Sequence, residues 1–135
     1  MDKEFIPYEQ ALELKELGFD EPCFGWFRST LIPSNFTEFF LDTEFGMNES
    51  PSDWVNSNLL DKACSAPLYQ QAFRWFKEKY NIFSCIMTEY SYGGHISAYH
   101  INGVRQSNIS KGDYKSYEEA ELECLKKLIE IAKNK

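Results

Sequence analysis

Apolar residues recur at helical spacing in three stretches of the chain. Over residues 7–18 this spacing predicts a short helix that a glycine ends. A stripe of aromatic residues predicts a second helix over residues 65–80, and the width of the stripe indicates that this helix is largely buried. Ser116 is followed three residues later by Glu119, a capping-box pattern that predicts the start of a final helix over residues 116–135.

Strand patterns fill the first half of the chain between these helices. Residues 23–28 and 36–41 are rich in aromatic residues and predict an amino-terminal hairpin. Residues 42–61 interrupt any periodicity with asparagine, serine, glycine and proline, and they predict a long polar loop. A loop of this length is either a functional lid or an inert insertion, and Trp54 in its middle slightly favours a function.

Alternating residues and glycine-marked turns predict a meander of three strands in the second half. Residues 82–92 alternate between two faces, and a Gly93-Gly94 turn leads to a strand over residues 95–101. The pair Asn102-Gly103 is a strong hairpin signal and leads to a third strand over residues 104–109.

Together these elements predict an α+β fold in one domain of 135 residues. The antiparallel sheet combines the amino-terminal hairpin with the three-stranded meander, and about three helices pack on one side of it. Aromatic residues make up 16% of the chain, which is more than a small core readily hides. This surplus favours a homodimer or a higher oligomer.

The last predicted helix is charged along one side. Glutamates occupy its first half and lysines its second half, as the helix dipole favours, so we expect this side to face solvent. The residues are Glu118, Glu119, Glu121, Glu123, Lys126, Lys127, Lys133 and Lys135.

Charge and composition exclude several classes of partner. The formal net charge of −7 is the opposite of what binding to a phosphate backbone needs, so we expect no binding to duplex nucleic acid. A basic pocket for a small anion is still compatible with this charge. We expect a cytoplasmic protein without a membrane partner, because the sequence shows neither a signal peptide nor an apolar run that could span a bilayer.

The residues that support catalysis or metal binding do not form known patterns. The four cysteines lack zinc spacing, so we expect core residues, no metal and no cofactor. His95 and His100 are an odd number of positions apart on a predicted strand, and they therefore point to opposite faces unless a bulge intervenes. We predict no catalytic residues, with a small hydrolase or nuclease as an alternative.

Binding is the function that the remaining residues favour. Aromatic and cationic side chains gather around the two predicted turns of the meander, and such side chains suit a nucleobase and a phosphate. Each of them is also common on a half-exposed strand of a protein that binds nothing. The candidate ligand-binding residues are Trp26, Arg28, Trp54, Tyr90, Tyr92, His95, Tyr99, His100 and Arg105.

Three blocks of the sequence resemble a family of small phage proteins. Residues 5–25, 66–80 and 117–131, which cover roughly half of the chain, are similar to uncharacterised proteins of bacteriophages and prophages of the Bacteroidota. The resemblance brings no activity and no site residues. It implies a phage accessory protein that acts inside an infected bacterial cell.

Three functions follow as hypotheses. The first is a non-catalytic protein that counters host defence by sequestering a nucleotide-like signal molecule, with the 42–61 loop closing over the ligand. The second is an acidic module that binds and inhibits a host protein. The third is the small hydrolase or nuclease, against which the absence of catalytic motifs counts.

Overall fold

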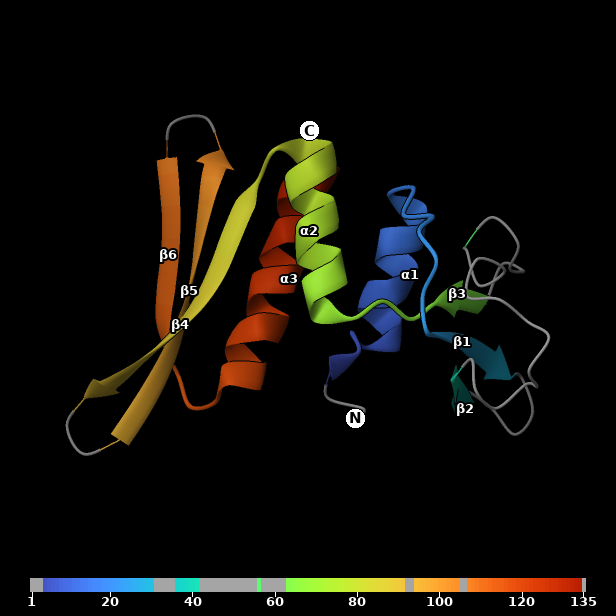
Figure 1. Cartoon of the computed structure of the whole chain (residues 1–135), viewed down its shortest axis with the longest axis horizontal. Helices are drawn as coiled ribbons and strands as arrows, with labels where there is room; N and C mark the ends of the chain where they lie inside the picture. Colours follow the sequence, from blue (N-terminus) through green and yellow to red (C-terminus); the bar gives the residue numbers. More distant parts are fainter. Residues whose placement is uncertain are drawn as a thin grey trace. The chain divides into compact units, whose positions relative to one another are not determined.

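The structure is a computed structural model that describes residues 4–30, 36–41, 56, 63–91, 94–104 and 107–134. The chain divides into two compact units, Met1–Leu68 and Tyr69–Lys135, and each is described by itself. Both combine α-helix with antiparallel strands, which confirms the predicted α+β fold (Figure 1), but the amino-terminal hairpin and the meander belong to two separate sheets where one combined sheet was expected. The assignment of all 135 residues to one domain stays a prediction. The elements are α1 (Tyr8–Glu16), β1 (Gly25–Thr30), β2 (Phe36–Leu41), β3 (Ala63–Ser65), α2 (Tyr69–Tyr80), β4 (Phe83–Ser91), β5 (Gly94–Val104), β6 (Ser107–Tyr114) and α3 (Tyr117–Lys133).

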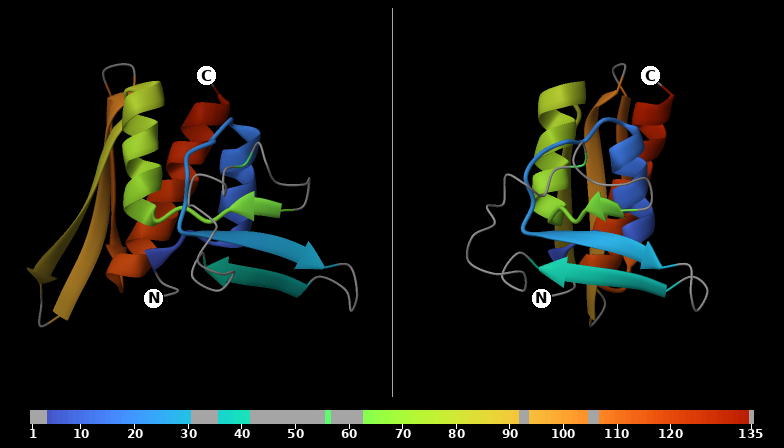
Figure 2. Two further views of the ribbon diagram at one scale, coloured as in Figure 1. Left: turned by 45° about the vertical axis from the view of Figure 1, so that its right-hand side comes forward. Right: turned by 90° about the vertical axis from the view of Figure 1, so that its right-hand side faces the viewer.

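The first unit contains α1 and a three-stranded sheet in the order β2-β1-β3 (Figure 2). The predicted hairpin is confirmed, because β1 and β2 pair antiparallel from Gly25 opposite Leu41 to Thr30 opposite Phe36. The prediction missed β3, which pairs with the other edge of β1. It also began the second helix too early, because Ser65 belongs to β3 and α2 begins at Tyr69.

Gly18 ends α1 as the sequence predicts. Its φ of 97° lies in the left-handed region that glycine adopts without steric cost. The Gly18 amide donates to the Lys15 carbonyl at 3.0 Å, and the Phe19 amide donates to the Leu14 carbonyl at 2.9 Å. This pair of hydrogen bonds is the Schellman motif, and it satisfies carbonyl groups that the end of a helix otherwise leaves unpaired.

Asn56 is the one residue of the predicted 42–61 loop that the structure describes. Its side chain is 5% exposed. The Asn56 amide nitrogen donates to the Phe19 carbonyl at 2.7 Å, and its amide oxygen accepts from the Ser65 backbone amide at 2.8 Å. Asn56 therefore joins the segment after α1 to β3 within the first unit.

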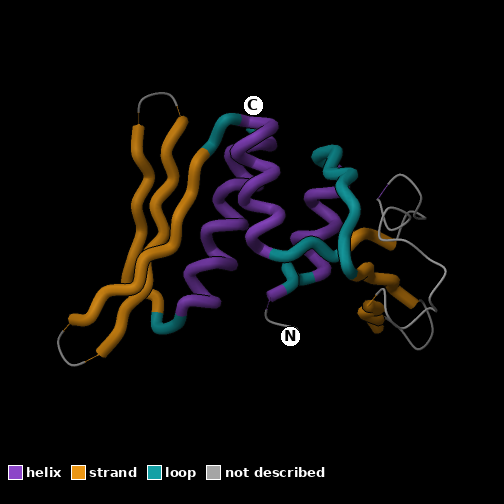
Figure 3. The backbone as a smooth tube through the Cα atoms, in the orientation of Figure 1, coloured by secondary structure: helices purple, strands orange, loops and turns teal. Residues whose placement is uncertain are grey.

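The second unit is the predicted meander, in the order β4-β5-β6, with α2 and α3 against one face (Figure 3). Alternate residues of β5 are buried on this inner face, among them Tyr99 and Ile101. The opposite, outer face carries Phe83 and Met87, which are both 45% exposed. The sheet therefore has one face in the core and one open face, as antiparallel sheets allow.

Both predicted turns of the meander are misplaced by at least one residue. Asn102-Gly103 is not the second turn, because β5 continues through it to Val104 and Val104 pairs with Ser107 of β6. The register shifts between Ile101 and Val104, so Asn102-Gly103 forms a bulge in place of a turn. Gly94 is likewise part of β5, where it pairs with Ser91.

Gly103 is fixed in this bulge by close contact with the segment that links α2 to β4. Its φ is +102°, and a Cβ atom added there would lie 2.5 Å from the carbonyl oxygen of Asn81. A side chain is therefore excluded by the backbone conformation and by the neighbouring backbone together.

The start of α3 agrees with the predicted cap. The Ser116 hydroxyl accepts a hydrogen bond from the Glu119 amide at 3.1 Å, and the Glu119 carboxylate accepts from the Lys115 amide at 3.3 Å. The prediction of a fully solvated charged side is wrong at Glu121, which is buried. Glu121 lies close enough to Tyr69 to contribute to raising the pKa of that phenol, although burial is the larger cause.

Among the described residues, no helix is both long enough and apolar enough to cross a bilayer.

Candidate ligand-binding groove

A cavity of about 330 Å³ lies in the second unit beside β5, β6 and α3. We call it the lysine groove, because three lysines contribute to its lining. The lining residues are Tyr99, Ile109, Ser110, Lys111, Glu123, Lys126, Lys127 and Glu130. Its three lysines exceed its two glutamates by one positive charge, in a protein whose formal net charge is −7.

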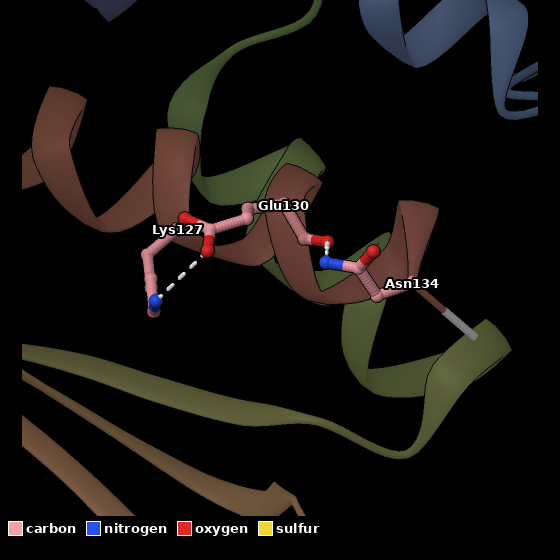
Figure 4. Close-up of polar contacts among 3 residues, drawn as sticks. All are labelled: Lys127, Glu130 and Asn134. Atoms are coloured by element: carbon pink, nitrogen blue, oxygen red, sulfur yellow. Dashed lines mark hydrogen bonds and ion pairs between the residues drawn. The ribbon is translucent and has the colours of Figure 1, made fainter.

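Two of the lysines belong to α3 and form ion pairs within that helix. Lys126 Nζ lies 3.2 Å from a carboxylate oxygen of Glu123, and Lys127 Nζ lies 3.2 Å from one of Glu130. Figure 4 shows the second pair, together with Asn134, whose side-chain amide donates to the Glu130 carbonyl at 3.0 Å. All four charged side chains are at least one third exposed, so each pair contributes at most about 1 kcal/mol to stability.

Lys111 comes from β6, where its backbone pairs with that of Tyr99. The residue is exposed, and within the described part of the chain its ammonium makes no ion pair. The strand thus carries one cation to the groove and the helix carries two.

Tyr99 forms the aromatic part of the groove. Its ring stacks on Tyr114 with centroids 6.0 Å apart and an interplanar angle of 19°, and only 4% of the residue is exposed. Burial, with a smaller contribution from Tyr114, raises the pKa of Tyr99 to about 12, so the phenol is neutral at physiological pH. Tyr99 therefore offers a ligand no open ring face, and its hydroxyl is hydrogen-bonded to Tyr114.

A second cavity of about 280 Å³ lies on the outer face of the same sheet. His100 and Gly112 contribute to its lining, and Ser110 and Lys111 line both cavities. His100 Nδ1 lies 2.6 Å from the Ser110 hydroxyl oxygen, at hydrogen-bonding distance. The remaining lining residues are Glu89, Ile96, Ala98 and Asp113.

The structure divides the predicted ligand-binding residues. Tyr99 and His100 are neighbours in β5 but line different cavities, because successive residues of a strand point to opposite faces. Tyr90 is 73% exposed on β4, and its backbone pairs with that of His95. The His95 side chain lies outside the described residues.

The other predicted residues belong to the first unit or to segments that are not described. Trp26 is half-buried in β1, and Arg28 lies two residues further along the same strand. The Arg28 side chain and the whole of Trp54, Tyr92 and Arg105 lie outside the described residues. Their joint role in one site stays a prediction.

Sequence reasoning missed the three lysines of the groove. Lys126 and Lys127 were fully explained by the helix dipole, and nothing local distinguishes Lys111. The three lysines come together only because β6 continues past residue 109 and carries Lys111 to the groove. The predicted third strand ended at residue 109, before Lys111.

The cysteines are core residues with one exception. Cys23, Cys64 and Cys124 are buried, whereas Cys85, which we also expected in the core, is exposed on the outer face of β4. None of the four cysteines, all of which the structure describes, forms a disulfide. No group of three or more His, Cys, Asp or Glu residues within the described ranges could hold a metal ion.

Searches for related proteins return no match to a protein family, to a curated protein or to a solved structure.

Proposed function

We propose that this protein is a non-catalytic binding protein for a small anionic, nucleotide-like ligand, and that the lysine groove holds the phosphate groups of that ligand. The observation that carries the proposal is the convergence of Lys111, Lys126 and Lys127 on one cavity in a strongly acidic protein. Local positive charge of this kind favours a compact anion over a nucleic acid duplex.

The ion pairs of α3 are weak enough for their lysines to bind a ligand in place of the glutamates. An exposed pair such as Lys127 with Glu130 is weak, so a phosphate oxygen can replace the carboxylate at little cost. Phosphate carries more charge and more acceptor oxygens than a single carboxylate, and it can contact Lys111 at the same time.

The size of the groove suits a small ligand. A volume of about 330 Å³ lies at the lower end of the range for small-molecule sites, roughly 300 to 1,000 Å³. Ile109 supplies an apolar wall on which the rest of the ligand can pack. In the setting that the resemblance to phage proteins implies, sequestering such a molecule would deprive a bacterial defence system of its signal.

Replacing Lys111 by glutamine is expected to weaken binding of the best-bound nucleotide by roughly 10- to 150-fold, because one charge-assisted hydrogen bond contributes roughly 1.5 to 3 kcal/mol. Isothermal titration calorimetry with individual linear and cyclic nucleotides measures this change. The matched control is Lys115→Gln, which removes the same charge from an exposed residue that does not line the groove. Equal losses of affinity in the two variants would contradict the proposed site.

Binding to a host protein is the second candidate function, and the outer face of the sheet favours it. Phe83 and Met87 lie there with 45% of each residue exposed, and side chains of this type are common in interface cores. A host partner on this face would leave the lysine groove open. Nucleotide affinity that depends on Lys111 therefore separates the two candidates.

A further inference from the structure

Three chemically active side chains form a row across the outer face of the second sheet. Cys85 of β4 pairs directly with His100 of β5, and His100 pairs directly with Ser110 of β6. Directly opposed residues of antiparallel strands have Cβ atoms about 4.5 to 5.5 Å apart on the same face. The Cys85 thiol and the His100 imidazole are therefore neighbours, and the Cys85 residue is exposed.

The contact between His100 and Ser110 determines which nitrogen of the imidazole can accept a proton. The Nδ1 atom lies 2.6 Å from the Ser110 hydroxyl oxygen. When Nδ1 carries the proton and donates to this oxygen, Nε2 retains a lone pair. That nitrogen can then accept the proton of a neighbouring thiol, and Ser110 acts as a positioning residue for the ring.

We propose that Cys85 is a reactive thiol, assisted by His100, that undergoes exchange with small disulfides on the outer face of the sheet. The Cys85 thiol transfers its proton to His100 Nε2, and the resulting thiolate attacks one sulfur of the disulfide. A bond forms between the Cys85 sulfur and that sulfur, the original disulfide bond breaks, and the departing thiolate takes the proton from His100. The products are a mixed disulfide on the protein and one free small thiol.

The surroundings of the row leave room for such a reagent. The cavity of about 280 Å³ lies on the same outer face, where His100 and Ser110 of the row line it and Cys85 does not. Charged side chains line this cavity from two strands: Glu89 from β4, and Lys111 and Asp113 from β6. With charges of both signs present, a neutral reagent reports the effect of His100 most directly.

The other cysteines provide an internal contrast. Cys23, Cys64 and Cys124 are buried, and burial raises the pKa of the Cys64 and Cys124 thiols to about 12. Buried thiols that stay protonated do not react with electrophiles. We therefore expect modification of the folded protein at one cysteine.

Two measurements test the proposal. Alkylation of the folded protein with the neutral reagent iodoacetamide at neutral pH is expected to label Cys85 alone, as located by peptide mass spectrometry. Incubation with bis(hydroxyethyl) disulfide should add one adduct that a reductant removes, and Cys85→Ser should abolish it.

Two substitutions test the role of His100. His100→Gln keeps a polar group beside Ser110 but accepts no proton, and His100→Phe removes both properties. Both are expected to slow alkylation at neutral pH roughly fivefold, because the thiol loses the neighbouring base that accepts its proton. Circular dichroism and thermal unfolding check that each variant folds.

Two results would overturn the proposal. One is an unchanged rate of alkylation in folded His100→Gln, which would show that the imidazole does not assist the thiol. The other is fast labelling of a cysteine other than Cys85 in the folded wild-type protein.

Discussion

Gly103→Ala is expected to lower the free energy of unfolding by roughly 3 kcal/mol, from the combined costs of a left-handed backbone and of overpacking. The added methyl group would lie 2.5 Å from the Asn81 carbonyl oxygen, and the φ of +102° strains any residue with a Cβ atom. Because the nearest atom belongs to the backbone, no side-chain rotation relieves the contact. Chemical denaturation followed by circular dichroism measures the change.

Gly112→Ala is the matched control. A Cβ atom at Gly112 would lie 3.3 Å from the Cβ atom of Ala98, and its φ lies outside the left-handed region. We therefore expect a change below about 1 kcal/mol, of either sign, for this substitution in the next strand of the same sheet. Equal effects of the two substitutions would show that the bulge does not hold Gly103 against Asn81.

Asn56→Ala is expected to lower the free energy of unfolding by roughly 2 to 4 kcal/mol, because it leaves two buried backbone groups unsatisfied. These groups are the Phe19 carbonyl, 2.7 Å from the Asn56 nitrogen, and the Ser65 amide, 2.8 Å from the Asn56 oxygen. A denaturant titration that follows intrinsic fluorescence measures the loss.

Asn134→Ala provides the comparison for Asn56. The Asn134 side chain also donates to a backbone carbonyl, that of Glu130 at 3.0 Å, but the contact is exposed at the end of α3. Water can replace it, so we expect a loss within about 0.5 kcal/mol. If Asn56→Ala were no more destabilising than Asn134→Ala, the two hydrogen bonds that join Asn56 to Phe19 and to Ser65 of β3 would not stabilise the first unit.

The elements that could be predicted are those whose signals are local. The helix that ends at Gly18, the capped helix that begins after Ser116, and the strand over residues 36–41 all depend on neighbouring residues. The structure places each of them within one or two residues of its expected position. Local capping and periodicity were sufficient here because no distant contact opposed them.

The errors arose where a distant contact decides the local structure. The pair Asn102-Gly103 carries the sequence signal of a hairpin turn, yet the chain uses it as a bulge because Gly103 packs against Asn81. The strand β3 has only three residues, and its partner β1 is far away in sequence. No periodicity can be recognised in so short a segment.

The candidate site also depends on contacts between residues that are distant in the sequence, and these were not predicted. The predicted cluster put Tyr99 and His100 in one site, but the two residues are successive in a strand and line different cavities. The lysine groove depends on which residues of β6 face α3, and that register is a property of the folded sheet. The row of Cys85, His100 and Ser110 likewise follows from cross-strand pairing, which sequence spacing does not reveal.

Native mass spectrometry of the protein purified from bacterial cells, before and after incubation with a pool of linear and cyclic nucleotides, tests the central claim most directly. We expect a bound nucleotide at a fixed ratio to the protein, and denaturation should release it chemically unchanged. A protein that binds nothing from the pool at micromolar concentration, or that releases an altered nucleotide, would contradict a non-catalytic binding function for the lysine groove.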